Sequence, residues 1–243
     1  NKLFYPLATH LVLPDCCDKG LWGNKRISYA GYHELAYLHP KTFNFNKNLI
    51  FKDSNNQKPF IIIRLVALTA SHDKGKKGLG IHLLNQIIEN YKNQYQILIS
   101  FEGKPNQQFK EYCYSFDPSL MHHFLAGAHL VIGDSQTMIA EAAVLGTPSI
   151  RFNDFVGKLG YLEDLEHKYG LTYGIKTSEP EKLLAKVNEL LSSTNIIEEW
   201  KRKRQKMLQD KIDVTAFMIW LIENYPASFK TMNENPDYQF NFK

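Results

Sequence analysis

The sequence predicts an α/β protein built on a Rossmann-like, doubly wound parallel sheet, and two local patterns carry this prediction. The segment 60–66 is a nearly continuous run of β-branched and other apolar residues, typical of a strand buried on both faces of a parallel sheet. Apolar residues then recur at helical spacing at Ile81, Leu84, Ile88 and Tyr91. A buried strand followed by an amphipathic helix indicates a βαβ crossover.

The other predicted elements continue this alternation, which βαβ crossovers require. Asp117-Pro118 is a helix start, because Asp caps free N–H groups and Pro fits the first turn. Pro40 ends a short helix, since the residue before proline is pushed out of the helical region. We expect strands at 10–13, 25–30, 96–101, from 131 and at 148–152, helices at 3–8, 33–38, 117–128, 160–169, 179–191 and from about 195, and an unstructured tail at 238–243.

Composition is that of an ordinary globular protein. The 243 residues are 44% hydrophobic and 22% charged, and the net charge of +4 permits an anionic ligand without indicating nucleic acid. Cys16, Cys17 and Cys113 form no disulfide framework, which fits a reducing compartment, so we expect a cytoplasmic location. No apolar run approaches the ~20 residues of a membrane-spanning helix.

The segment 131–150 predicts an anion site. It reads as an apolar strand, a polar turn, a helix of small residues and a second strand. The N–H groups at the helix start lack intrahelical partners, and the positive end of the helix dipole favours an anion there. Glu141 shares a helix face with Thr137 and suits the hydroxyls of a ribose. The candidate ligand-binding residues are Gly133, Asp134, Ser135, Gln136, Thr137 and Glu141.

Further candidates follow two other strands at the same expected edge of the sheet. His72 and Asp73 come just after the strand at 60–66, where open α/β sheets place their ligands. The alternative is that His72 only caps a turn. Arg64 lies within that strand, and we interpret it as half of a structural ion pair. Arg151, Asn153 and Asp154 follow the strand after the anion turn.

Four blocks of the sequence, 28–40, 64–73, 133–146 and 151–157, resemble in this order a prokaryotic family of unknown function that is related to UDP-N-acetylglucosamine 2-epimerases and GT-B glycosyltransferases. The resemblance implies a lobe that binds UDP or a UDP-sugar without a cofactor. Ser135 and the following amides would hold phosphate, Glu141 the ribose, and His72 the diphosphate as the catalytic residue. In the epimerases two glycines stand where this chain has Gln136 and Thr137.

The resemblance also implies a domain organisation. It predicts the end of an N-terminal Rossmann-like lobe at 1–40, a linker at 41–58, a C-terminal nucleotide-binding lobe at 59–213, and a terminal helix and tail at 214–243. We expect the rest of the N-terminal lobe to be missing from this chain and to be its partner in the complete protein. Glycosyl transfer is favoured over epimerisation, because the Arg and Glu-Asn that follow this His in the epimerases are absent from 73–76.

Other interpretations stay open. The lobe is either an enzyme or a non-catalytic binding module. The departures from the epimerase turn would favour the binding module. The basic run 201–206 with the apolar run 214–222 suggests either attachment to a membrane surface or nucleic acid, or a solvated helix followed by a packed one. We favour the second, because the apolar run is too short to span and no aromatic residues interleave the basic ones. No Cys, His or Asp cluster has metal-ligand spacing, the adjacent His122 and His123 included.

Overall fold

The computed structural model describes residues 5–50, 58–66, 78–102 and 107–243. The chain forms two compact units, one of residues 1–43 with 205–243 and the other of residues 44–204. We call these unit 1 and unit 2. His72 and Asp73 lie outside the described residues.

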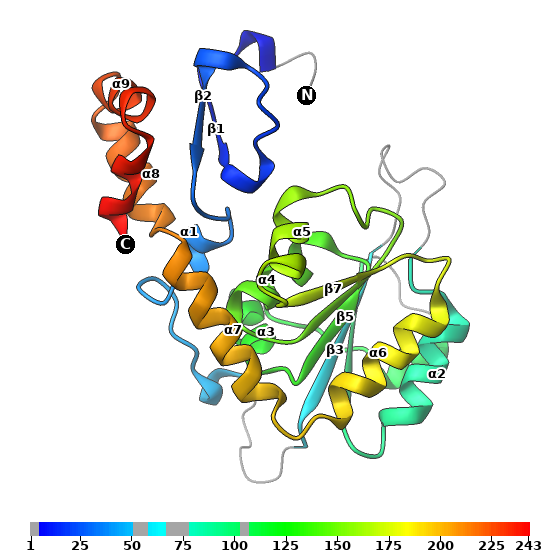
Figure 1. The fold of residues 1–243 in the computed structure, drawn as a ribbon. Helices are drawn as coiled ribbons and strands as arrows, with labels where there is room; N and C mark the ends of the chain where they lie inside the picture. Colours follow the sequence, from blue (N-terminus) through cyan, green and yellow to red (C-terminus); the bar gives the residue numbers. More distant parts are fainter. Residues whose placement is uncertain (1–4, 51–57, 67–77, 103–106) are drawn as a thin grey trace. The chain divides into compact units, whose positions relative to one another are not determined.

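Unit 2 contains a five-stranded sheet in which every paired strand is parallel (Figure 1). The strand order is β4-β3-β5-β6-β7, which confirms the predicted Rossmann-like, doubly wound sheet. The edge strand β7 was not predicted, because its four residues include Gly174 and form no apolar run. The strands are β3 (Phe60–Leu65), β4 (Gln96–Phe101), β5 (Leu130–Gly133), β6 (Ser149–Phe152) and β7 (Thr172–Ile175).

Helices cover both faces of this sheet (Figure 1). On one face α2 (Ile81–Tyr91) and α6 (Pro180–Ser192) lie side by side, joined by a 3.4 Å hydrogen bond from the Tyr91 hydroxyl to Asn188. The other face carries α3 (Met121–Gly127), α4 (Gln136–Leu145) and α5 (Gly160–His167). The predicted helix at 117–128 is a 3-10 turn, Pro118–Leu120, followed by α3. Ile81 begins α2 and is exposed, whereas Leu84, Ile88 and Tyr91 are buried.

The central strands of the sheet and the helix α4 are deeply buried. The residues of β5 and the first four residues of β3 are almost completely shielded from solvent. Ala140, Ala142 and Ala143 of α4 are also fully buried, and their small size lets α4 lie close to β5 and β6. A helix of small residues therefore follows β5 because it has to pack directly on the sheet.

The order of the strands creates a switch point between β3 and β5. The chain passes from β3 to β4 on one side, then crosses to the other side of β3 to form β5, and continues outward to β6 and β7. The connections that follow β3 and β5 therefore leave in opposite directions. In open α/β sheets, ligands bind outside the carboxyl ends of the strands at such a point.

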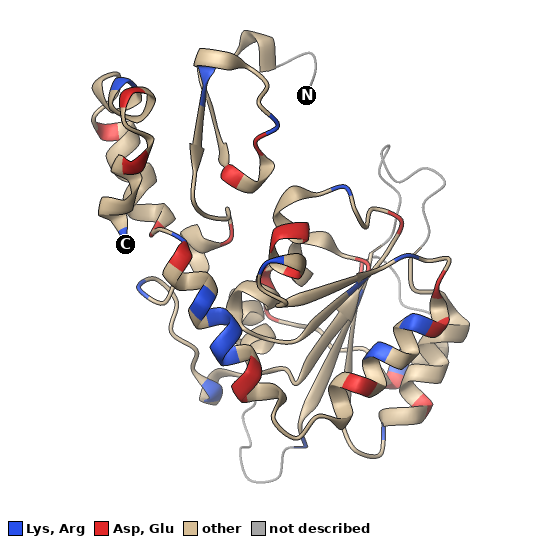
Figure 2. Ribbon diagram, viewed as in Figure 1, with Lys and Arg blue, Asp and Glu red and all other residues tan. Residues whose placement is uncertain are grey.

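The basic run of the sequence lies on α7 (Ile196–Asp210), where Figure 2 shows the concentration of blue. Lys201 pairs with Glu198 at 2.6 Å and Lys203 with Glu199 at 2.7 Å. Arg204 Nε donates a 3.0 Å hydrogen bond to the carbonyl oxygen of Val144 in α4. Three cations of this run thus have partners within the chain.

Unit 1 pairs a small parallel sheet with helices from the end of the chain. The strands are β1 (Leu11–Pro14) and β2 (Arg26–Tyr29), and the helices are α1 (Leu35–Leu38), α8 (Val214–Glu223) and α9 (Ala227–Glu234). The α8 helix packs on α1 and buries Val214, Phe217 and Leu221. Along the described part of the chain, no helix combines the length and the apolar character needed to cross a lipid bilayer.

The predicted unstructured tail at 238–243 is wrong. Residues Pro236–Phe242 form a 3-10 helix, and the Gln239 side chain is buried. Gln239 Oε1 accepts a 2.6 Å hydrogen bond from the N–H of Ala30, and the carbonyl of Phe242 accepts one from Asp213. The error arose because contacts with residues far away in the chain, such as Ala30, leave no local pattern in the sequence.

Candidate functional site

Asp134 lies at the switch point, one residue beyond β5. Its carboxylate is buried, with a residue exposure of 6%. Oδ1 accepts a 2.8 Å hydrogen bond from the N–H of Val66, at the end of β3, and the carboxylate also accepts one from the N–H of Leu79. Val66 and Leu79 stand on either side of the segment 67–77, which contains His72 and Asp73. Both described flanks of that segment are therefore held by one carboxylate.

The carboxylate of Asp134 is buried and closely surrounded by other atoms. Burial raises the pKa of Asp134 to about 6, although hydrogen bonds from Val66, Leu79 and its own N–H, and the charge of Arg64, act in the opposite direction. A Cβ atom at Gly78 would overlap Oδ2 of Asp134. Glycine at position 78 thus allows the backbone to approach the carboxylate closely.

Ser135 caps α4 beside this carboxylate. Its Oγ accepts a 3.4 Å hydrogen bond from the N–H of Met138, and α4 begins after this polar turn, where the sequence predicted a helix start. The N–H groups of Gln136 and Thr137, in the first turn, point out of the helix end. The helix dipole adds positive potential at the same place. This geometry suits an anion at the carboxyl edge of the sheet.

Glu141 lies farther along α4 and contacts α3. Its side chain is 13% exposed, and its Oε1 lies 3.3 Å from Nε2 of His122. The neighbouring His123 is oriented differently, since its Nδ1 accepts a 3.1 Å hydrogen bond from the N–H of Asn46. Sequence reasoning proposed Glu141 as a ligand residue but did not identify His122 as its partner, because the contact depends on how α3 and α4 pack.

A row of alternating arginines and glycines crosses the sheet at its carboxyl edge. Arg64 of β3, Gly133 of β5, Arg151 of β6 and Gly174 of β7 are in register, so they share one face of the sheet. Ser149, two residues before Arg151, donates a hydrogen bond to α4, which identifies the face as the one that α4 covers. The glycines leave room for the arginines. A Cβ at Gly133 would overlap the carbonyl oxygen of Arg64, and one at Gly174 would lie 2.9 Å from Arg151 Nη2.

Arg64 is tied to its neighbours as the sequence predicted. Nη1 donates a 2.8 Å hydrogen bond to Ser100 Oγ, and Nη2 lies 3.6 Å from Oε2 of Glu102. The predicted structural ion pair is confirmed. Its partner, Glu102, follows β4, the strand next to β3.

Arg151 lies in the interior with its side chain 1% exposed. Its Nη2 is 3.0 Å from Oε1 of Glu163 in α5, while Nε and Nη1 have no hydrogen-bond partner among the described residues. Glu163 also accepts hydrogen bonds from the N–H of Gly157 and from His167. Glu163 was not singled out in the sequence, although its spacing of four residues from His167 was visible there.

The turn after β6 is fastened to the turn after β5. The amide of Asn153, which is buried, donates a 2.8 Å hydrogen bond to the carbonyl oxygen of Asp134 and accepts one from the N–H of Phe155. The carboxylate of Asp154 accepts a hydrogen bond from the hydroxyl of Thr177. The structure thus brings Asp134 and Asn153 together, as their positions after adjacent parallel strands imply.

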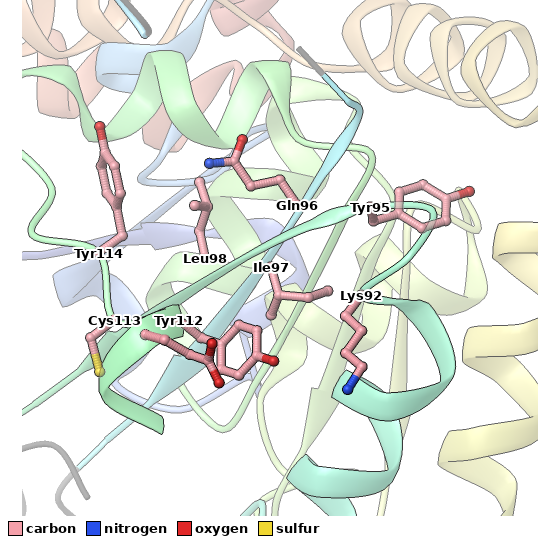
Figure 3. Close-up of a pocket in the computed structure, with 9 residues that line it drawn as sticks. Lys92, Tyr95, Gln96, Ile97, Leu98, Tyr112, Cys113 and Tyr114 are labelled. Atoms are coloured by element: carbon pink, nitrogen blue, oxygen red, sulfur yellow. The ribbon is translucent and has the colours of Figure 1, made fainter. Parts of the chain in front are cut away.

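A separate pocket of about 270 Å³ lies along the outer edge of β4 (Figure 3). Tyr95, Tyr112 and Lys92 line it together with Gln96–Leu98, the amino-terminal half of the strand. The switch point is at the carboxyl ends of the strands, so this pocket is distinct from the candidate site. No group of three or more His, Cys, Asp or Glu side chains in the described ranges could hold a metal ion.

The family of the chain follows from its sequence. Residues 1–223 match the family described as "Protein of unknown function (DUF354)". The chain belongs to this family. The four sequence blocks indicated a family of unknown function, and this prediction is confirmed. No curated protein matches the chain.

Several solved structures are similar to this DUF354 protein at low identity. A putative UDP-N-acetylglucosamine 2-epimerase from Listeria monocytogenes has a TM-score of 0.45 and 17% identity over 79% of this chain and 49% of its own. The UDP-GlcNAc 2-epimerase of Methanocaldococcus jannaschii, solved with UDP-GlcNAc and UDP, has a TM-score of 0.49 and 17% identity over 72% and 51%. The glycosyltransferase SnogD from Streptomyces nogalater has a TM-score of 0.49 and 12% identity over 81% and 56%. The chain thus spans about half the length of these proteins.

Proposed function

We propose that unit 2 binds the nucleoside diphosphate part of a UDP-sugar and that the protein is a glycosyltransferase of the GT-B type. The observation that carries this proposal is the position of the Asp134–Val66 hydrogen bond at the switch point of the sheet. It places the start of α4 beside the flanks of the segment with His72. A helix N-terminus at a switch point is where α/β proteins bind phosphate groups.

The proposed roles follow from exposure and hydrogen-bonding capacity. The N–H groups of Gln136 and Thr137 and the Ser135 hydroxyl are donors for the phosphate oxygens. Glu141 accepts hydrogen bonds from the ribose hydroxyls. His72 stabilises the charge that develops on the diphosphate as it leaves, which is the electrostatic form of catalysis.

The buried residues have a different proposed role. Asp134, Arg151 and Asn153 form hydrogen bonds and ion pairs with the protein itself. They position the turns after β3, β5 and β6 and do not themselves contact ligand in this proposal. Asp73 and Asp154 remain candidates for contact with the sugar.

Binding measurements test the proposal. The protein is titrated calorimetrically with UDP, UDP-sugars and inorganic pyrophosphate. We expect saturable binding of UDP. Ser135→Ala should weaken both UDP and pyrophosphate by about 10- to 100-fold, because one donor to a charged oxygen is worth roughly 1.5–3 kcal/mol.

Glu141→Gln should weaken UDP and leave pyrophosphate unchanged, because only UDP has a ribose. Glu198→Gln, on the exposed surface of α7, is the matched control and should change neither. If wild-type protein binds no member of the UDP series, the proposal is wrong and the alternative, a non-catalytic binding module, is favoured.

A further inference from the structure

Glu141 is a largely buried carboxylate on α4. Its neighbours along α4, Ala140 and Ala142, are fully buried, and its own side chain is only 13% exposed. It is the sixth residue of α4, so it lies beyond the first turn, where the helix dipole stabilises an anion. A carboxylate in this position needs donors from outside its helix.

His122 is such a donor. Its Nε2 lies 3.3 Å from Glu141 Oε1, and it reaches across from α3, which packs against α4. The ring is 32% exposed, so the pair lies at the margin of the core. A donor on a neighbouring helix restricts the rotamers that Glu141 can adopt about its three side-chain bonds.

The chemistry of a ribose makes this restriction useful. Two adjacent hydroxyl groups donate to a carboxylate only when its oxygens face them, and a carboxylate accepts several hydrogen bonds at once. A Glu141 side chain that is already oriented loses less freedom when the nucleoside binds. Inorganic pyrophosphate has no hydroxyls of this kind, so its binding does not depend on Glu141.

We propose that His122 is a positioning residue that orients Glu141 and thereby sets the preference of the site for a nucleoside diphosphate over inorganic pyrophosphate. This inference rests on the function proposed above. His123, the next residue on α3, is oriented differently and serves as a control. Its Nδ1 accepts a hydrogen bond from the N–H of Asn46, and its ring centroid lies 6.3 Å from that of Phe45.

The test compares dissociation constants for UDP and pyrophosphate in variants of the full chain. His122→Leu removes the donor, and we expect about a tenfold weaker affinity for UDP, the effect of losing roughly one good hydrogen bond, with pyrophosphate unchanged. His122→Gln, whose amide N–H can take the place of Nε2, should restore most of the affinity for UDP. His123→Ala should leave the ratio of the two constants as in wild type. In a Glu141→Gln background, His122→Leu should have no further effect.

His122→Asn guards against loss of folding in His122→Leu, since its amide is too short to reach Glu141 and should also weaken UDP selectively. Equal weakening of UDP and pyrophosphate by these variants would show that His122 only supports the fold. An unchanged affinity for UDP in them, with a loss in Glu141→Gln, would overturn the inference and leave the proposed function standing. Failure of wild type to bind UDP would instead overturn the proposed function, and this inference with it.

Discussion

The backbone N–H of Val66 donates a 2.8 Å hydrogen bond to Oδ1 of Asp134, and this bond joins the ends of β3 and β5. The two residues are 68 positions apart in the chain. Because Leu79 donates to the same carboxylate, Asp134 holds both described flanks of the segment 67–77. A buried carboxylate in this role makes the stability of the site dependent on pH.

The first prediction concerns that dependence. Burial raises the pKa of Asp134 from 3.8 to about 6. A carboxyl group with a raised pKa in the folded protein contributes stability that is fully present below pH ~4 and is lost as the pH rises through ~6. Asparagine does not titrate, so the Asp134→Asn variant lacks this pH dependence. The free energy of unfolding of wild type minus that of the variant should therefore decrease as the pH rises from 4 to 7. The fall should be at most about 3 kcal/mol, from 1.36 kcal/mol per pKa unit.

Urea denaturation at pH 4, 5, 6 and 7 measures this difference. Asp117→Asn is the control. Hydrogen bonds from Ser119 lower the pKa of Asp117, so its stabilising effect is lost only as the pH falls below about 4. The difference for Asp117→Asn should therefore stay level across the range. A level difference for Asp134→Asn would contradict the assigned pKa shift.

The second prediction concerns the row of arginines and glycines. Gly133→Ala places a Cβ against the carbonyl oxygen of Arg64, a backbone atom that cannot move without disturbing β3. We expect the free energy of unfolding to fall by about 1–3 kcal/mol, the usual cost of overpacking. Gly80→Ala is the matched control, because a Cβ there meets no atom within 4 Å and the φ angle of −76° suits alanine.

Thermal and urea unfolding of the two variants give the comparison. Gly80→Ala should cost less than Gly133→Ala, because it loses only the preference for glycine at the N-cap of α2 and creates no overlap. Equal losses in both variants would show that Gly133 does not lie as close to the carbonyl oxygen of Arg64 as it does in the structure.

The sheet could be predicted from the sequence where its strands are buried on both faces. β5 and, apart from Arg64, β3 are apolar runs for that reason. β7 could not, because it is an edge strand whose middle residues, Tyr173 and Gly174, are half-buried. Its place beside β6 depends on α5, which returns the chain to the sheet. The predicted tail failed for a similar reason, since Gln239 is ordered by a contact with Ala30.

The candidate site could be predicted only in its local parts. The start of α4 after the polar turn depends on neighbouring residues and is confirmed. The bonds from Asp134 to Val66 and from Glu141 to His122 depend on which strands and helices are neighbours, and the sequence shows neither directly. The residue types at the edge were therefore predictable, but their hydrogen-bond partners were not.

The third prediction concerns the buried arginine of the same row. Glu163→Gln removes the charge opposite Arg151, whose side chain is 1% exposed. We expect a loss of about 1.5–3 kcal/mol in the free energy of unfolding, the scale of a hydrogen bond to a charged group. Glu198→Gln breaks an ion pair with Lys201 in which both side chains are exposed, and it should cost less than about 1 kcal/mol.

Chemical denaturation of both variants at one pH provides the measurement. If Glu198→Gln lowers the free energy of unfolding as much as Glu163→Gln does, the burial of Arg151 does not make its ion pair more stabilising than an exposed one. A larger loss in Glu163→Gln would support the role of Glu163 in holding Gly157 and Arg151 together at the turn after β6.

The fourth prediction separates glycosyl transfer from epimerisation. Epimerisation at C2 of UDP-N-acetylglucosamine removes a proton from carbon and later returns one, so solvent deuterium enters the recovered sugar nucleotide. Transfer leaves that C–H bond intact. Because the residues after His72 lack the Arg and Glu-Asn of the epimerases, we expect no deuterium at C2 when the intact protein is incubated with this substrate in deuterated water without an acceptor.

His72→Ala provides the accompanying test of the site. In the proposed site His72 would stabilise charge on the diphosphate in either chemistry, so we expect turnover to fall by about 10²-fold, the scale for losing one such donor. Mass spectrometry of the sugar nucleotide reads the exchange, and release of UDP in the presence of an acceptor reads the transfer. Deuterium at C2 would favour the epimerase alternative. Undiminished turnover in His72→Ala would remove His72 from the catalytic site whichever reaction the protein performs.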